Sequence, residues 1–165
     1  MPGEYVDPVR NRSKLYTSPA TRMGGYDMKN RPWGTEWADA LSMSNPEIDA
    51  EHKHFIDLVN MLNREIASQQ RDKDNILRIM GLILDDARAH FAHEERLFKE
   101  KAYPKAEEHA QIHKKLIAAL NQSLEDIRNT DHVRRWVEVG LATETALVTH
   151  LVDEDTKYID YLRTN

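Results

Sequence analysis

Seven residues of this chain have the side chains and the spacing that a metal site needs: His52, His90, Glu94, His109, His113, His150 and Asp155. Glu94 follows His90 by four residues, and His113 follows His109 by four. An α-helix turns by about 100° per residue, so partners four residues apart project from nearly the same face. Five imidazoles and two carboxylates that converge would form a pocket for two metal ions.

These residues also continue the apolar stripes of the predicted helices. The first stripe advances in steps of three and four residues through Ile48, His52, Phe55, Val59, Leu62 and Ile66. Such steps are typical of one buried helical face, and the stripes around His90, His109 and His150 follow the same rule. Burial of so many ionisable groups without partners would cost several kcal/mol each, and metal ions would satisfy them.

The spacing of the last pair is different, because Asp155 follows His150 by five residues. In a regular α-helix this spacing would place the two side chains about 140° apart. Either Asp155 reaches the site from the flank of the helix, or a one-residue π-bulge between the two residues turns it inward. We favour the bulge.

The number of ligands favours a site with one open position. Five imidazoles, two bridging carboxylates and one bridging oxide or hydroxide supply about eleven of the roughly twelve positions that two six-coordinate ions need. Iron suits imidazole and carboxylate ligands, whereas zinc prefers fewer of them. The pattern therefore predicts two iron ions as cofactors, with an open position where a small diatomic molecule such as O2, or an anion, could bind.

The charge of such a centre favours a binding protein over an enzyme. Two ferrous ions with two carboxylates and one hydroxide remain slightly positive, which is a poor environment for high-valent iron. Di-iron enzymes in helical bundles use four glutamates with two Glu-x-x-His motifs, and the inward-facing residues lack such a pair. We therefore predict no enzymatic activity. Apolar residues within about one turn of the ligands would exclude water and line the O2 pocket: Phe55, Phe91, Leu147 and Leu151.

Start and stop signals predict four helices. The first follows the cap residue Asn45, with Pro46 at the first helical position. Asn129 to Asp131 supply a turn and cap before the last helix. The predicted helices span residues of about 46–68, 74–100, 104–128 and 132–162. Short loops between them predict an all-α fold, an up-down-up-down antiparallel four-helix bundle with the di-iron site in its core.

Composition and charge divide the chain into two parts. With 165 residues, of which 40% are hydrophobic and 31% charged, the chain fits one domain with a single core. Residues 1–33 hold six basic and three acidic residues and four prolines, without a helical stripe. We predict an extended or flexible arm there and the bundle in residues 34–165.

Net charge and composition also limit the classes of binding partner. The net charge is −5 for the whole chain and −8 outside the arm, which argues against nucleic-acid binding. The sequence has no apolar run of about 18 residues and no apolar segment typical of a secretory signal. It also has no cysteine. We expect a cytoplasmic protein without membrane insertion.

Three histidines remain outside the predicted ligand set. His54 lies two residues after His52 and would point outward, and His132 lies in a turn, so both are expected to be exposed. His93 flanks the face of His90 and Glu94, and we expect it to lie outside the site.

Four segments resemble a known family. They are EIDAEHK around His52, HFAHEE from His90, YPKAEEHAQIH ending at His113, and HLVDEDTKY from His150. From about Trp37 to Leu162 the sequence resembles the hemerythrins, especially the bacterial single-domain ones. The resemblance implies a non-heme di-iron site, bridged by oxide or hydroxide, that binds O2 reversibly.

The resemblance also implies a role for each ligand. One iron would take His109, His113 and His150, and the other would take His52 and His90. Glu94 and Asp155 would bridge, and O2 would bind end-on to the two-histidine iron. Two positions depart from the family pattern. Ala146 stands where bacterial relatives often have tryptophan, which would alter the pocket, and Ser44 replaces a common glycine, which we expect to matter little.

The leading hypothesis is an O2-binding protein that stores or transports O2 or delivers it to an oxygen-using enzyme. One alternative is a sensor of O2, nitric oxide or redox state, with the basic arm as the effector. Another is an enzyme that reduces nitric oxide or peroxide at the open position.

Overall fold

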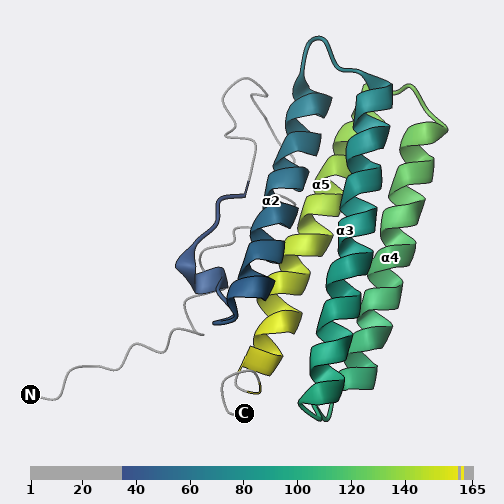
Figure 1. Cartoon of the computed structure of the whole chain (residues 1–165). Coiled ribbons are helices and arrows are strands. Elements are labelled where there is room, and N and C mark those ends of the chain that lie inside the picture. The colour runs from purple at the N-terminus through teal and green to yellow at the C-terminus, as the bar shows by residue number, and fades with distance from the viewer. Residues whose placement is uncertain (1–34, 160, 162–165) are drawn as a thin grey trace, which may run out of the picture.

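The predicted helices form a bundle in the computed structural model, which describes residues 35–159 and residue 161. The four long helices are α2 (Pro46–Ala67), α3 (Lys73–Glu100), α4 (Ala106–Arg128) and α5 (Val133–Thr149). Each packs against two others, α2 and α4 both contacting α3 and α5, and short loops reverse the chain between them (Figure 1). The all-α, up-down-up-down arrangement is confirmed. The predicted arm of residues 1–33 lies outside the described residues.

Local signals explain where the first two helices begin. The Asn45 side chain accepts hydrogen bonds from the backbone N–H groups of Glu47 and Ile48 at 3.0 and 3.3 Å, and Pro46 occupies the first helical position. These contacts satisfy donors that have no partner inside the helix. Asp72 caps α3 in the same way through the N–H of Asp74. A 3-10 turn at Asp39–Leu41 precedes α2.

The predicted start of the third helix was wrong by two residues. We expected Pro104 to open it, but α4 begins at Ala106. The preceding helix ends in a Schellman turn, in which the Tyr103 N–H donates to the Phe98 carbonyl at 2.9 Å. Ala102 has a φ of 49°, in the left-handed region that this turn requires. Pro104 therefore falls in the connection between the two helices.

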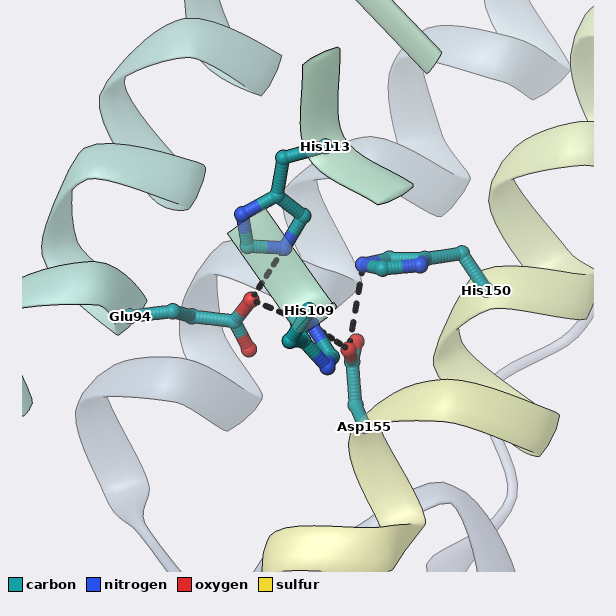
Figure 2. Close-up of side chains that lie close together, drawn as sticks. All are labelled: Glu94, His109, His113, His150 and Asp155. Carbon is teal, nitrogen blue, oxygen red and sulfur yellow. Dashed lines mark ion pairs between the residues drawn. The ribbon is translucent and has the colours of Figure 1, made fainter. Parts of the chain in front are cut away.

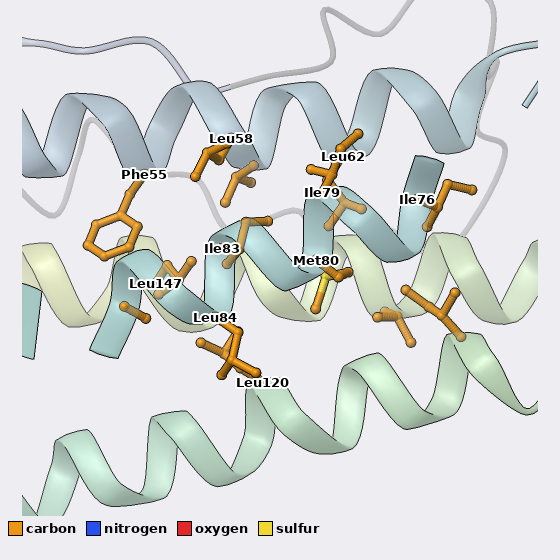
Figure 3. Close-up of a cluster of buried hydrophobic side chains, with 14 of the residues drawn as sticks. Phe55, Leu58, Leu62, Ile76, Ile79, Met80, Ile83, Leu84, Leu120 and Leu147 are labelled. Carbon is orange, nitrogen blue, oxygen red and sulfur yellow. The ribbon is translucent and has the colours of Figure 1, made fainter. Parts of the chain in front are cut away.

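The core has two parts. The larger cluster lies between the four helices and includes Leu62, Ile76, Ile79 and Ile83, each at most 2% exposed (Figure 3). A smaller cluster packs Phe98, Tyr103 and Tyr158 together with residues of the segment before α2 and the chain after α5. The predicted metal ligands lie in α2, α3 and α4 and in the turns directly after α5.

Candidate metal centre

The seven predicted ligands meet in the interior of the bundle. Their side chains are at most 3% exposed. Ligand atoms within 4.8 Å of one another form two groups among the described residues. Figure 2 shows the first group, Glu94, His109, His113, His150 and Asp155. The second group is His52, His90, Glu94 and Asp155. Both carboxylates belong to both groups, which is the arrangement that two ions sharing two bridges require.

A π-helical turn places the last ligand. Regular α-helix ends at Thr149, residues His150–Glu154 form a π-helix, and a 3-10 turn follows from Asp155 to Tyr158. The predicted bulge is therefore confirmed, and the chain stays helical beyond it through the 3-10 turn to residue 159. The extra residue turns Asp155 inward, so that its Oδ1 lies 3.1 Å from His150 Nε2.

Several polar atoms of the centre lie close together without forming hydrogen bonds of good geometry. His113 Nε2 lies 3.1 Å from Glu94 Oε2, and His109 Nε2 lies 3.3 Å from Asp155 Oδ1. These four atoms are all buried and lack a hydrogen-bond partner of good geometry. Orphaned buried polar atoms are rare and need an explanation. Metal ions bound between these atoms would accept their lone pairs. The set of donors therefore fits a metal site.

The carboxylates keep their charge despite complete burial. Burial raises the pKa of Glu94, but the charge of His90 and the contacts with His109 and His113 outweigh it and hold this pKa well below its usual range. The pKa of Asp155 is also lowered, because His150, His109 and His52 counter the effects of burial and of the Glu94 charge. Two anions held at this position attract cations.

The histidines respond in opposite directions. Burial lowers the pKa of His109, but the adjacent Asp155 and Glu94 carboxylates outweigh it and raise this pKa to about 9. Burial dominates at His150 and lowers its pKa to about 4. Without metal, the His109 imidazole therefore carries a second proton and a positive charge at neutral pH, whereas the His150 imidazole is neutral. Metal binding must displace the proton on His109, since an imidazole ligand is neutral at the coordinating nitrogen.

An outer layer of hydrogen bonds orients the ligands. His90 Nδ1 lies 2.6 Å from Glu51 Oε2, and His113 Nδ1 lies 3.0 Å from Glu95 Oε1. The Tyr158 hydroxyl donates to Glu94 Oε1. Carboxylate partners of this kind fix which imidazole nitrogen faces the metal. The sequence reasoning missed Glu51 and Glu95, although each directly neighbours a predicted ligand in the chain.

The expectation for His93 was wrong in one respect. Its Nδ1 lies 2.8 Å from Glu51 Oε1, so His93 reaches the centre through Glu51 and His90. It belongs to the outer layer without being in either ligand group. His54 and His132 are exposed, as predicted, and His54 pairs with Asp86 at 2.9 Å.

Apolar and aromatic side chains surround the imidazoles. Phe91 stacks on His113 with ring centroids 4.0 Å apart and an angle of 8° between the rings. Phe55 contacts His90 edge-on at 5.1 Å. Both are buried, as are Leu147 and Leu151. Phe98 adds an edge-on contact with His109 at 4.9 Å, which the sequence reasoning did not include.

Known proteins share this sequence pattern. The sequence model of the hemerythrin HHE cation binding domain matches residues 44–162. The chain belongs to the hemerythrin family. It is 27% identical over 139 residues to a bacteriohemerythrin of Stenotrophomonas maltophilia, covering 78% of this chain and 82% of that protein. It is 26% identical over 127 residues to one of Pseudomonas paraeruginosa, covering 77% and 80%.

A bacteriohemerythrin of Campylobacter jejuni is 25% identical over 125 residues, which cover 73% of this chain and 90% of that protein. The region matched by the hemerythrin model contains all seven predicted ligands and the π-helical turn. Within the described residues, no helix has both the length and the apolar character needed to cross a membrane.

Proposed function

We propose that this hemerythrin-family protein binds two iron ions and uses them to bind O2 reversibly. The observation that carries the proposal is the pair of ligand groups that share Glu94 and Asp155. One group adds three histidines and the other adds two. With six positions on each ion and one oxide or hydroxide bridging both, this asymmetry leaves one position open on the two-histidine side.

In the proposed assignment His109, His113 and His150 hold one ion, His52 and His90 hold the other, and Glu94 and Asp155 bridge them. Ferrous ions bound there would supply the electrons for reversible O2 binding. Glu51 orients the His90 ring and Glu95 orients the His113 ring, by the contacts described above. Their removal would loosen the ligands without removing a donor.

The apolar walls support a binding role. Phe55 and Leu147 are each 2% exposed, Phe91 is 3% and Leu151 is 4%. Such walls exclude water and protons from the open position, which protects a bound ligand from irreversible reaction. We propose that these four residues line the O2 pocket, and that the protein stores O2, transports it or delivers it to an oxygen-using enzyme.

The test combines metal analysis with an optical titration. Protein loaded anaerobically with ferrous iron is expected to contain about two ions per chain. Exposure to O2 should produce a charge-transfer band that disappears when O2 is removed. A single ion per chain, absence of the band, or catalytic turnover of O2 with a reductant would contradict the proposal.

A pair of variants assigns the binding position. His90→Ala should lose the two-histidine ion and the O2 band, because only His52 and the bridges would remain there. His54→Ala is the matched control, since His54 is an exposed histidine with a side chain that is 60% exposed. It should keep both ions and the band. Normal O2 binding by His90→Ala would refute the assignment.

A further inference from the structure

Ions that fill the candidate centre must reach it from solvent, although the predicted ligands are at most 3% exposed. A groove between α2 and α3 leads to the centre, and its lining includes His90, a member of the two-histidine ligand group. His52 Nε2 lies 3.2 Å from His90 Nε2, and Glu94 Oε1 lies 3.5 Å from the same atom. The groove therefore ends at the wall of the centre.

Small side chains leave the groove wide enough for a hydrated ion. Ala50 lines it from α2, and Ala89 and Ala92 line it from α3. All three alanines are exposed, so no longer side chain covers the groove at these positions. The groove has a volume of about 730 Å³. An ion with six water molecules occupies roughly 200 Å³, at about 30 Å³ per water, and therefore fits inside.

The polar side chains of the groove favour cations. Three carboxylates line it, from Glu47, Glu51 and Asp86, against one guanidinium, from Arg96. The imidazoles of His54 and His93 also line it. A cleft with an excess of one charge raises the local concentration of ions of opposite charge and speeds their association. Carboxylate and imidazole groups are also ligands that divalent iron accepts.

The groove offers these donors in an order of decreasing exposure. Glu47 is 81% exposed, and its Oε2 lies 3.7 Å from Nε2 of His93, which is 15% exposed. His93 Nδ1 lies 2.8 Å from Glu51 Oε1, and Glu51 Oε2 lies 2.6 Å from His90 Nδ1. Complete loss of hydration water in one step would be costly for an ion. A series of donors lets the ion exchange its water molecules one at a time.

Two smaller openings beside the centre suit a cation less well. One has a volume of about 10 Å³, and its lining includes His109 together with the ammonium groups of Lys105 and Lys157. The other, between α2 and α5, also has about 10 Å³ and is lined by apolar side chains and Thr35. Neither volume holds an ion with its water molecules. The groove between α2 and α3 has both the room and the charge.

We propose that this groove is the entry site for divalent cations, and that Glu47, His93 and Glu51 bind the ion in turn before it reaches His90. The inference rests on the proposed function for the two-ion centre, and it assigns to the groove the loading of that centre. In the last step the ion replaces His90 as the partner of Glu51 Oε2, which frees the His90 ring to turn and admit the ion.

Two arginine substitutions test the groove as a route. Ala89→Arg adds bulk and positive charge inside the groove, and Ala119→Arg makes the same change at an exposed residue of α4 that does not line it. Metal-free full-length protein is mixed rapidly with Co²⁺, and uptake is followed by the absorption bands of the bound ion. Uptake should be about tenfold slower in Ala89→Arg than in the wild type and unchanged in Ala119→Arg.

The release of Co²⁺ distinguishes a blocked route from a weakened site. A barrier on the route slows release to a chelator as well as uptake, and the final content of about two ions per chain stays the same. An unchanged uptake rate in Ala89→Arg, an equal slowing in Ala119→Arg, or slower uptake combined with faster release would overturn the proposal.

A second pair of variants tests the charge of the groove without adding bulk. Asp86→Asn removes a carboxylate that lines the groove, and Asp85→Asn removes the adjacent one, which is 75% exposed and does not line it. Co²⁺ uptake at low salt should be several-fold slower in Asp86→Asn than in Asp85→Asn. The difference should shrink at high salt, because exposed charges are then screened. Equal rates for the two variants at low salt would overturn the role of the charge.

Co²⁺ uptake does not depend on O2 chemistry, so the two proposals can fail separately. Slower uptake in Ala89→Arg, together with absence of O2 binding by the iron-loaded wild type, would support the entry site and contradict the proposed function. Reversible O2 binding by the wild type, with equal uptake rates in Ala89→Arg and Ala119→Arg, would overturn this inference alone.

Discussion

The two ends of the bundle bury opposite kinds of side chain. At the end near the helix connections Ala67–Lys73, residues such as Leu62 and Ile76 are 0% exposed and contact other aliphatic side chains. At the other end, His52 and Glu94 are equally buried, at 0%, among ionisable groups. Apolar burial stabilises the first end by itself, whereas the second end holds charges that bound ions would satisfy. One half of each helix therefore contributes mainly to the stability of the fold, and the other half contributes to the candidate metal centre.

The largest expected effect comes from a shared carboxylate. Glu94→Ala removes a donor from both ligand groups, so the chain should retain less than one ion after dialysis instead of about two, as measured by metal analysis. Glu100→Ala, at an exposed residue of the same helix, serves as the control and should keep both ions. Retention of two ions by Glu94→Ala would show that the carboxylate does not bridge.

A substitution at the apolar end should lower the stability of the fold and leave the metal content unchanged. Leu62→Ala leaves a cavity in the core and should lower the free energy of unfolding by about 2–5 kcal/mol, measured by urea denaturation of the metal-free protein. The metal content should not change. The neighbouring Met61 is 39% exposed, and Met61→Ala should stay within about 0.5 kcal/mol of the wild type. Loss of metal in folded Leu62→Ala would mean that the two ends are coupled.

The pH dependence separates the metal-free from the metal-loaded state. The pKa of His109 is raised from 6.5 to about 9 in the folded chain, so its contribution to stability is present below pH 6.5 and lost as the pH rises to about 9. The pKa of His150 is lowered from 6.5 to about 4, so the unfolded chain gains a proton first and stability falls as the pH drops from 6.5 to about 4. The raised pKa of His90 adds to the alkaline loss.

Metal-free protein should therefore be most stable near pH 6.5, as measured by urea denaturation in chelator across the pH range. Bound ions replace the proton on His109, so the metal-loaded protein should lose the alkaline decline and keep the acid one. A metal-free stability that rises steadily from pH 6.5 to pH 9 would contradict the charge pattern of the site.

The sequence predicted which buried side chains converge, because helical phase determines the faces that they share. His90 and Glu94 share a face by their spacing alone, and the five-residue step to Asp155 predicted the π-turn. The hydrogen bonds that orient these histidines from outside the ligand groups could not be predicted from helical phase. Glu51 meets His90 across 39 positions of the chain, and that contact depends on how far α2 is shifted along α3. Helical phase does not specify this shift.

The ends of helices show a similar limit. Proline is favoured at the first position of a helix, which led us to place Pro104 there. The cap of the preceding helix decided the outcome, because Ala102 and Tyr103 complete the Schellman turn first. Ser44 gives a second case, since its φ of 58° lies in the region that favours glycine. A glycine, which is common here in the family, would adopt this φ without the conformational cost that a serine carries.

The smallest expected effect concerns the Schellman turn, which lies at the end of the bundle that holds the centre. Ala102 has a φ of 49° and is exposed, so its methyl group contributes strain and little packing. Ala102→Gly should raise the free energy of unfolding by about 0.5–1 kcal/mol, measured by urea denaturation. The contact between Phe98 and Tyr103, with ring centroids 5.2 Å apart, should hold the turn in place. Since Phe98 also touches His109, an unchanged metal content would show that this strain is local, whereas a lower affinity for metal would show that the turn helps to position the centre.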